Sequence, residues 1–310
     1  MALRLPDRWL WDFWFAREGD DVHVFYLQAP RSLGRPELRH WNATIGHSVT
    51  RDLRTWEVLE DALGAGPPGA FDDLATWTGS IVRQGGRWHL LYTGVSRADA
   101  PLQRVGRAVS DDLVGWERHG VVVESDPRWY ERVHWRDPWV QPDPDGGGFH
   151  MFLTARANVG AFDGRGVIAH AVSADLGTWV VQPPVTEPGE FFELEVPQLV
   201  HLAGAWRLFF CTTGVHHSAA RRARGVMPET GTHYMTARRM LGPYALDRDG
   251  FLMGHPEGRH YAGRVIEHGG QWWFLAWHMQ EPRGGFAGIL SDPMPIIAGD
   301  DGSLAVLEPR

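Results

Sequence analysis

The sequence predicts an all-β protein, a five-bladed β-propeller with four antiparallel strands in each blade. Two short patterns recur five times in register, and the runs between them have strand composition bounded by Gly, Pro and Asp. No apolar pattern of helical period extends beyond two turns. Dividing 310 residues by five gives 62 per repeat, enough for four short strands, so we expect one domain over residues 1–310.

The first recurring pattern is a turn followed by an alternating strand rich in aromatic residues. It predicts the second strand of each blade. Its five copies lie at 21–26, 86–92, 148–153, 205–210 and 271–276.

The second pattern is Ser/Thr-x-Asp-Leu-x-x-Trp. Full copies stand at 50–56, 110–116 and 173–179, and degenerate versions at 239–244 and 291–293. Because Asp52, Asp112 and Asp175 recur once per blade at a tight turn, we interpret them as turn-forming residues and not as catalytic ones.

The order of strands within a blade predicts which face binds a ligand. Connections between second and third strands are long, whereas the turns between first and second strands are short. Long loops gathered on one rim favour that rim as the binding face. The predicted inner strands, which line the channel, lie at 9–15, 77–81, 135–139, 193–198 and 260–264.

Three carboxylates fall at corresponding places on these inner strands: Asp12, Asp137 and Glu195. Glu193 is two residues before Glu195 and shares its face, and we take Glu195 as the functional member of the pair. Burying an unpaired carboxylate costs several kcal/mol, so three aimed at one place indicate chemistry, a metal or an arginine cluster. Cleavage of a glycosidic bond uses such a set.

Composition excludes several other kinds of protein. All 30 basic residues are arginine, which excludes a lysine nucleophile, a Schiff-base lysine and a Walker A phosphate loop. Cys211 is the only cysteine, so there is no internal disulfide and no cysteine zinc site. A net charge of −8 argues against a general nucleic-acid binder. The 16 histidines are scattered, and we predict neither a metal nor a cofactor.

No segment approaches the ~20 apolar residues of a membrane span, and the amino terminus lacks a secretory signal pattern. We therefore expect a cytoplasmic protein without a membrane partner, whose partner is a small carbohydrate. The sequence is compatible with a homo-oligomer. The segment Arg221–Arg224 is interpreted either as a solvated loop or as a contact for an anionic group, a distant sugar or a subunit.

Six short elements stand in order along the whole chain. They are Trp-Leu-Trp-Asp at 9–12, Phe-Tyr-Leu-Gln-Ala-Pro at 25–30, Gly-His-Ser-Val-Thr-Arg-Asp-Leu at 46–53 with Trp56, Trp-Thr-Gly-Ser at 77–80, Arg-Asp-Pro at 136–138 and Glu-Val-Pro-Gln at 195–198. Together they resemble the β-fructofuranosidases of glycoside hydrolase family 32, within the clan of five-bladed propeller enzymes that act on fructans.

This resemblance implies hydrolysis of a furanoside with retention of configuration at the anomeric carbon. The favoured substrate is a β-D-fructofuranoside such as sucrose or a short fructo-oligosaccharide. Asp12 would be the nucleophile, Glu195 the acid and base, and Asp137 the residue that holds ring hydroxyls. A retaining pair of carboxyls stands ~5–5.5 Å apart. Candidate substrate contacts are Trp11, Gln28, Trp77, Ser80, Arg136, His260 and Arg264.

The chain departs from the family pattern at the sugar contacts. Trp11 and Trp14 replace two Asn residues beside the nucleophile, Phe13 replaces a Pro, and Leu27 replaces a Gln that Gln28 follows. We also expect these residues to hold no C-terminal β-sandwich of the kind found in the family, because after the predicted fifth blade only 303–307 remains, enough for one strand.

Two alternatives stay open. An arabinofuranosidase or xylosidase of family 43 type also uses two Asp and one Glu but inverts, with its carboxyls ~6.5–9.5 Å apart. A non-catalytic sugar-binding propeller is the other. It predicts the loss of at least one of the three acids, and all three are present.

Overall fold

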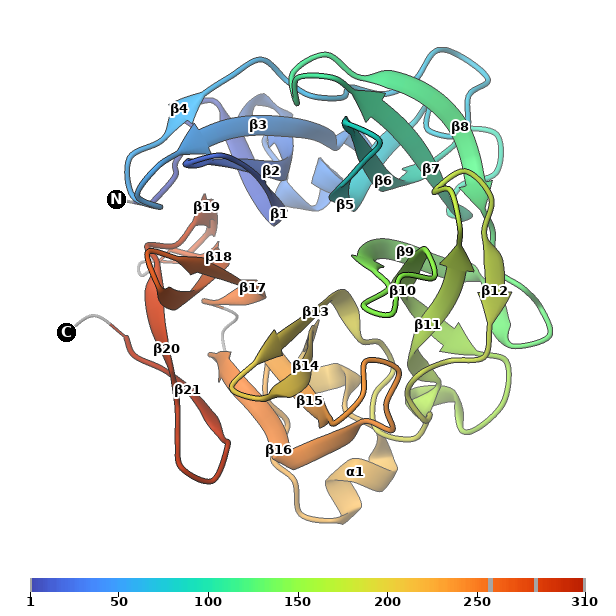
Figure 1. Ribbon diagram of the computed structural model, residues 1–310, viewed down its shortest axis with the longest axis vertical. Coiled ribbons are helices and arrows are strands. Elements are labelled where there is room, and N and C mark those ends of the chain that lie inside the picture. Colours follow the sequence, from blue (N-terminus) through green and yellow to red (C-terminus); the bar gives the residue numbers. More distant parts are fainter. Residues whose placement is uncertain (1, 256–258, 282–283, 309–310) are drawn as a thin grey trace.

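Five twisted sheets stand around a central axis in the computed structural model, which describes residues 2–255, 259–281 and 284–308. Figure 1 shows the predicted five-bladed propeller, with β1, β5, β9, β13 and β17 nearest the axis. The prediction of fold class is confirmed. Among the described residues, no helix is long and apolar enough to cross a membrane.

In every blade the strands are arranged in chain order from the axis outward. In blade 5 two strands, β19 and β20, share the third position, and β21 is the outermost strand. Blade 1 holds β1 (Arg8–Glu18), β2 (Asp21–Pro30), β3 (Thr44–Thr50) and β4 (Glu57–Val58). Blade 2 holds β5 (Ala75–Gln84), β6 (Arg87–Val95), β7 (Gln103–Ser110) and β8 (Glu117–Val123). Blade 3 holds β9 (Tyr130–Pro142), β10 (Phe149–Ala157), β11 (Gly166–Ser173) and β12 (Val180–Gln182).

Blade 4 holds β13 (Glu195–Leu202), β14 (Ala205–Thr212), β15 (Gly231–Ala237) and β16 (Ala245–Gly254). Blade 5 holds β17 (Tyr261–His268), β18 (Gln271–Gln280), β19 (Phe286–Leu290), β20 (Met294–Ala298) and β21 (Leu304–Val306). Short helices occupy the loops between second and third strands: η1 (Arg31–Leu33), η2 (Pro36–Asn42), η3 (Phe162–Gly164), η4 (Gly214–His216) and α1 (Ala219–Ala223).

The third strand of blade 5 is divided, because β19 and β20 both pair with β18. Residues 291–293 lie between these two pieces. The sequence predicted this segment as the fifth copy of the turn that follows a third strand, and that prediction was wrong. Pro293 has no N–H to donate to a ladder, so the strand is interrupted there and the turn to β21 comes later.

The repeated Asp-Leu turns have the role that the sequence predicted. The Asp52 carboxylate accepts hydrogen bonds from the backbone N–H groups of Arg54 and Thr55. Asp112 and Asp175 make the equivalent pairs of bonds. The next residue of each turn has a positive φ and a buried side chain: Leu53 (58°), Leu113 (66°) and Leu176 (61°).

Each inner strand changes register as it passes the channel mouth. The shift in β1 lies between Trp11 and Phe13, and matching shifts occur in the other four blades. Backbone φ is positive at Asp12 (20°) and Asp137 (56°), a region that non-glycine residues rarely adopt. A bulge places one extra residue on its strand and changes the direction of its side chain. The two aspartates therefore lie at breaks in the regular alternation.

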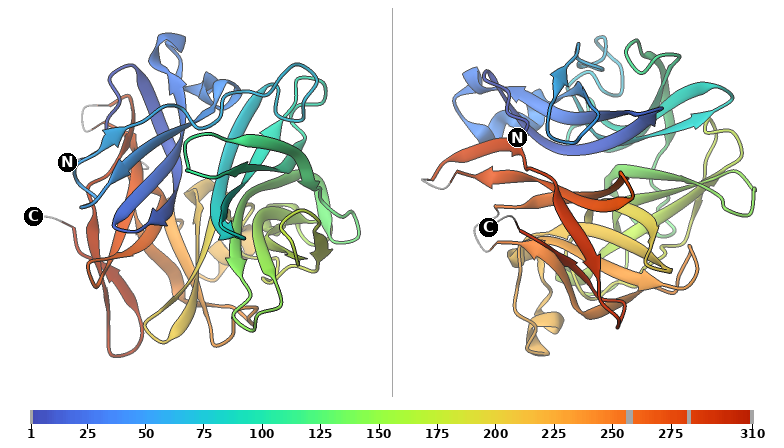
Figure 2. Two further views of the ribbon diagram at one scale, coloured as in Figure 1. Left: turned by 45° about the horizontal axis from the view of Figure 1, so that its top comes forward. Right: turned by 60° about the vertical axis from the view of Figure 1, so that its left-hand side comes forward.

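The ring closes by packing, since no strand is shared between blades 1 and 5 in the described chain. Leu3 and Leu5 pack in one cluster with Leu275 and Leu290 of blade 5. The N–H of Leu290 also donates to the carbonyl of Leu3 at 3.0 Å. Figure 2 shows the amino-terminal segment beside the last blade.

Candidate active site

A pocket of about 250 Å³ opens on the face that carries the long loops. It brings together the three carboxylates from β1, β9 and β13. The residues that line it are Trp11, Asp12, Leu27, His40, Trp77, Thr78, Gln103, His134, Arg136, Asp137, Glu193 and Glu195.

Asp12 is held by donors from the two neighbouring blades. The indole N–H of Trp277 donates to Oδ1 at 3.1 Å, and the hydroxyl of Thr78 donates to Oδ2 at 2.9 Å. Burial raises the pKa of Asp12 to about 7, and the negative charges of Asp137 and Glu195 add to the shift. The carboxylate is thus oriented but costly to ionise.

Asp137 is fixed by blades 2, 3 and 4 at once. Its Oδ2 accepts from the Thr154 hydroxyl at 3.0 Å and from the Val196 N–H at 3.1 Å. Its own N–H donates to the Thr93 hydroxyl at 2.9 Å. Burial raises its pKa, although the guanidinium of Arg136 opposes the shift.

Arg136 joins Glu195 to Glu193, the neighbouring glutamate on the same face. Its Nη2 donates to Oε2 of Glu193 at 2.8 Å and to Oε1 of Glu195 at 2.9 Å. The second oxygen of Glu195 accepts from the Tyr261 hydroxyl. On Glu193, Oε1 lies 3.0 Å from Nδ1 of His134.

These surroundings push the two pKa values apart. Burial raises the pKa of Glu195, and the charge of Glu193 raises it further. Burial acts in the same direction on Glu193, but Arg136 and His134 outweigh it and hold its pKa at about 2. One glutamate thus favours keeping a proton while its neighbour stays ionised, which suits a proton donor beside a fixed charge.

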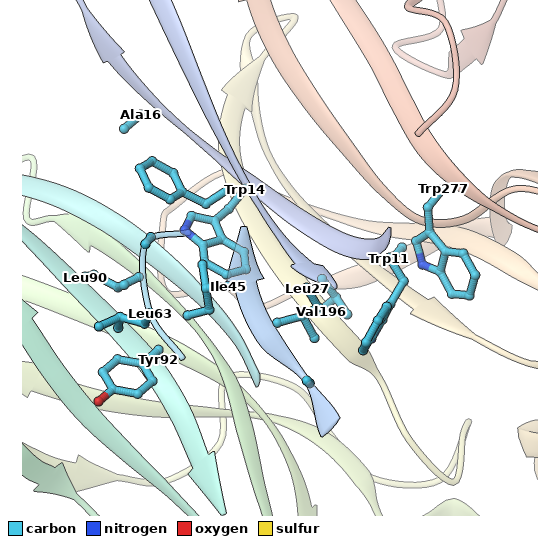
Figure 3. Packing of buried hydrophobic residues seen from close by; sticks show 14 of the residues in the cluster. Trp11, Trp14, Ala16, Leu27, Ile45, Leu63, Leu90, Tyr92, Val196 and Trp277 are labelled. Carbon is cyan, nitrogen blue, oxygen red and sulfur yellow. The ribbon is translucent and has the colours of Figure 1, made fainter. Parts of the chain in front are cut away.

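Aromatic and apolar side chains complete the walls. Trp11 and Trp77, two of the candidate substrate contacts, line the pocket together with Leu27. Trp14 is fully buried and stacks on Phe25. Figure 3 shows Trp14 near Ile45, Leu63, Leu90 and Tyr92, whereas Trp11 lies beside Trp277.

Four predicted contacts are not among the residues that line the pocket. Strand alternation turns Gln28 to the opposite face from Leu27, where its amide lies over Gly46. The Ser80 hydroxyl accepts from the Val140 N–H at 3.0 Å and joins blades 2 and 3. The ring of His260 lies 4.7 Å from that of His278.

Arg264, the fourth, is fully buried in the channel. It donates to the carbonyl of Phe13 at 3.1 Å and to the carbonyl of Pro197, so it ties together the bulges of β1 and β13. Its guanidinium carbon lies 5.3 Å from the centroid of Trp139. The bulge in β17 places this residue among the strands and not on the pocket wall.

Several residues of the site escaped the sequence reasoning. Thr78 lies inside the Trp-Thr-Gly-Ser element at 77–80, of which the sequence predicts only Trp77 and Ser80 as substrate contacts. Trp277 and Tyr261 come from blade 5, and no local pattern marks them. His134 and Gln103 are single polar residues near strand starts, which is too weak a signal for sequence reasoning.

Outside the pocket, the arginine segment has a structural explanation. Arg221 and Arg224 both pair with Glu190, at 3.0 Å for Arg221. Within the part of the chain that the structure describes, no group of three or more His, Cys, Asp or Glu side chains could hold a metal ion.

Comparison with known proteins identifies the family of this chain. The sequence model described as "Glycosyl hydrolases family 32 N-terminal domain" matches residues 15–278. The chain belongs to glycosyl hydrolase family 32. The match begins within β1 and ends within β18 of blade 5 of this family 32 propeller, and Asp12 lies just before its first residue.

Two curated relatives are named sucrose-6-phosphate hydrolase. The one from Bacillus subtilis (strain 168) is 30% identical over 207 residues, which is 64% of this chain and 40% of the relative. The one from Zymomonas mobilis subsp. mobilis is 31% identical over 167 residues, or 52% of this chain and 30% of the relative. The matched part thus spans less than half the length of these relatives.

Solved structures show the same fold at lower identity. The inulosucrase from Halalkalicoccus jeotgali, described as bound to kestose, superposes with a TM-score of 0.81 at 22% identity. The superposition covers 98% of this chain and 89% of the inulosucrase. At this identity the likeness supports the fold alone.

Proposed function

We propose that this family 32 protein is a retaining glycoside hydrolase that cleaves a β-D-fructofuranoside, either sucrose or a short fructo-oligosaccharide. The observation that carries the proposal is the meeting of Asp12, Asp137 and Glu195 in one pocket. Two curated relatives named as sucrose-6-phosphate hydrolases support a sucrose-like substrate.

In the proposed first step, Asp12 attacks the anomeric carbon while the bond from that carbon to the leaving oxygen breaks. Glu195 gives its proton to this oxygen, so the leaving group departs as an alcohol. The raised pKa of Glu195 supports the donor role. The donors Trp277 and Thr78 hold the Asp12 carboxylate in place for attack.

In the second step, the ionised Glu195 takes a proton from water, and the oxygen of that water bonds to the anomeric carbon. The bond to Asp12 breaks, and the second displacement restores the original configuration. Asp137 would accept hydrogen bonds from ring hydroxyls and stabilise positive charge on the ring. Arg136 would hold Glu195 and neutralise part of the negative charge of the pocket.

The test compares Asp12→Asn and Glu195→Gln with Asp111→Asn, an exposed control outside the pocket. The panel contains sucrose, inulin-type and levan-type oligosaccharides, and aryl arabinofuranosides. We expect cleavage of fructosides by the wild type, with kcat/KM lower by about a thousandfold or more in the two pocket variants. Turnover that survives in Asp12→Asn contradicts the assignment of the nucleophile.

Stereochemistry separates the alternatives. The first-formed product, followed by NMR, should keep the configuration of the substrate. Inversion with preference for an arabinofuranoside indicates family 43 chemistry, and absence of turnover on the whole panel indicates a binding protein.

We further propose that residues 1–310 act as one domain in the cytoplasm, with a small carbohydrate as partner. Cell fractionation and the mass measured by light scattering on the purified protein test the location and the oligomeric state.

A further inference from the structure

Three aromatic rings continue the pocket wall outward along blades 3 and 4. We call Phe162, Phe192 and His216 the aromatic shelf. The ring centroids of Phe162 and Phe192 are 5.3 Å apart, and those of Phe192 and His216 are 5.0 Å apart. Phe192 also contacts His134, a pocket residue, with centroids 6.3 Å apart. The shelf and the pocket are therefore continuous.

The shelf exposes apolar surface that folding did not bury. The side chain of Phe162 is 66% exposed, and Val215, next to His216, is 79% exposed. Single exposed apolar residues are ordinary on protein surfaces. A contiguous exposed group that adjoins a ligand pocket marks a binding surface.

A fully buried arginine fixes the two phenylalanines. The guanidinium carbon of Arg156 lies 3.6 Å from the ring centroid of Phe192 and 4.7 Å from that of Phe162. Its Nη1 and Nη2 donate to the carbonyls of Phe192 and Phe162, each at 2.8 Å. Burying a guanidinium is costly. Here it orients an exposed surface, as expected for a preformed site.

The side chains of the shelf carry neither a carboxylate nor a guanidinium. The buried Arg156 guanidinium beside them pairs with Glu131, whose Oε2 lies 3.0 Å from Nε and whose Oε1 lies 3.0 Å from Nη1 of Arg165. The shelf consists of two phenyl rings and one imidazole, and its Phe162 is exposed. Aromatic rings bury the C–H surface of a sugar ring, and because they are rigid they lose little entropy on binding.

The position of Glu195, the proposed proton donor, indicates which part of a substrate lies on the aromatic shelf. Glu195 must face the oxygen of the leaving group. Phe192 lies three residues before Glu195 in the chain and contacts His134, which lines the pocket. The leaving group therefore extends toward blade 4. We propose that the aromatic shelf binds the sugar units of an oligosaccharide leaving group beyond the scissile bond, and that the preferred substrates are oligosaccharides longer than a disaccharide. This inference rests on the proposed function.

The test measures kcat/KM on a fructoside series of two, three and four sugar units. In Phe162→Ala, the ratio of kcat/KM for the tetrasaccharide to that for the disaccharide should fall about fivefold to tenfold, mainly through KM. Val58→Ala removes a side chain of 55% exposure from the outer strand β4 and should leave the ratio unchanged. An unchanged ratio in Phe162→Ala overturns the inference.

A second measurement separates this inference from the proposed function. If the wild type cleaves the disaccharide but Phe162→Ala leaves the length dependence intact, only the shelf assignment fails. If the wild type cleaves no fructoside, the proposed function fails, and the tetrasaccharide is titrated into both proteins by calorimetry. Weaker binding to Phe162→Ala then supports the shelf, and equal or absent binding to both proteins overturns it.

Discussion

Two glutamates of the pocket, Glu193 and Glu195, stand two residues apart and share one arginine. Both are largely removed from solvent, but Arg136 and His134 keep Glu193 ionised, and its charge favours the proton on Glu195. The difference arises from neighbours on other strands. At this scale the chemistry of a side chain is set by what surrounds it.

Replacing Glu193 with Gln should move the alkaline limb of the kcat/KM profile to lower pH. Loss of the neighbouring negative charge lowers the pKa of Glu195, so its proton is lost earlier as pH rises. The measurement is a pH series of kcat/KM. Glu187→Gln, exposed and outside the pocket, is the matched control. An unmoved alkaline limb would show that Glu193 does not set the pKa of Glu195.

Ionisation of the buried Asp12 should lower the free energy of unfolding at neutral pH. Its pKa is about 7 in the folded protein, against about 3.9 in an unfolded chain, so the folded state binds the proton more tightly. Stabilisation by the proton is complete below about pH 4 and is lost as pH rises through about 7.

Asp12→Asn should therefore gain stability relative to the wild type by about 2–4 kcal/mol between pH 4 and pH 8. Urea unfolding at several pH values measures this difference. Asp111→Asn, at an exposed site, should show no such trend. A difference that stays constant with pH contradicts the raised pKa of Asp12.

At the scale of elements, two devices shape each blade. Asp-Leu turns lead from third to fourth strands in blades 1–3, and bulges break the inner strands at the channel. The turns have the same sequence pattern because each one connects a third strand to a fourth strand with the same hydrogen bonds. The bulges lie at the same place in each blade, but they hold different residues. Blades 1 and 3 have Asp12 and Asp137 there, and blade 5 has Ala262.

Asp112→Ala should lower the free energy of unfolding by about 1–2 kcal/mol and leave kcat/KM unchanged. The substitution leaves the N–H groups of Val114 and Gly115 without their acceptor in a turn remote from the pocket. Asp111→Ala, one residue earlier and exposed, is the control. Equal losses in both variants would argue against the turn role.

At the scale of the whole molecule, the ring depends on the packing of blade 1 against blade 5. The amino-terminal Leu3 and Leu5 fill the joint, and Arg264 of β17 donates to the carbonyl of Phe13 in β1. Because the pocket needs Trp277 and Tyr261 from blade 5, closure of the ring also completes the site.

Leu3→Ala should lower the free energy of unfolding by about 2–4 kcal/mol, because it opens a cavity at the joint. Calorimetry should show one cooperative transition at a lower temperature, as for a single domain. Leu307→Ala, at a position of 47% exposure, serves as the control. Two separate transitions would contradict the single domain, and an unchanged Tm would contradict closure through Leu3.

Particular residues show which parts of the fold and of the site the sequence predicts. The repeats predicted the blades, and the inner-strand positions brought Asp12, Asp137 and Glu195 to one pocket. The same reasoning placed Gln28 and Arg264 at the substrate. Neither residue is among those that line the pocket, because bulges and strand alternation decide which side chain faces it, and no sequence pattern marks a one-residue shift.

The sequence by itself determined the blade, because alternation and turn residues act over a few neighbours and recur with each repeat. It also determined which acids meet at the channel mouth. Only the tertiary structure decided what surrounds them: Thr78 and Trp277 on Asp12, Arg136 between two glutamates, and Arg156 under the shelf. Those contacts join residues far apart in the chain, and they exist only once five blades close into a ring.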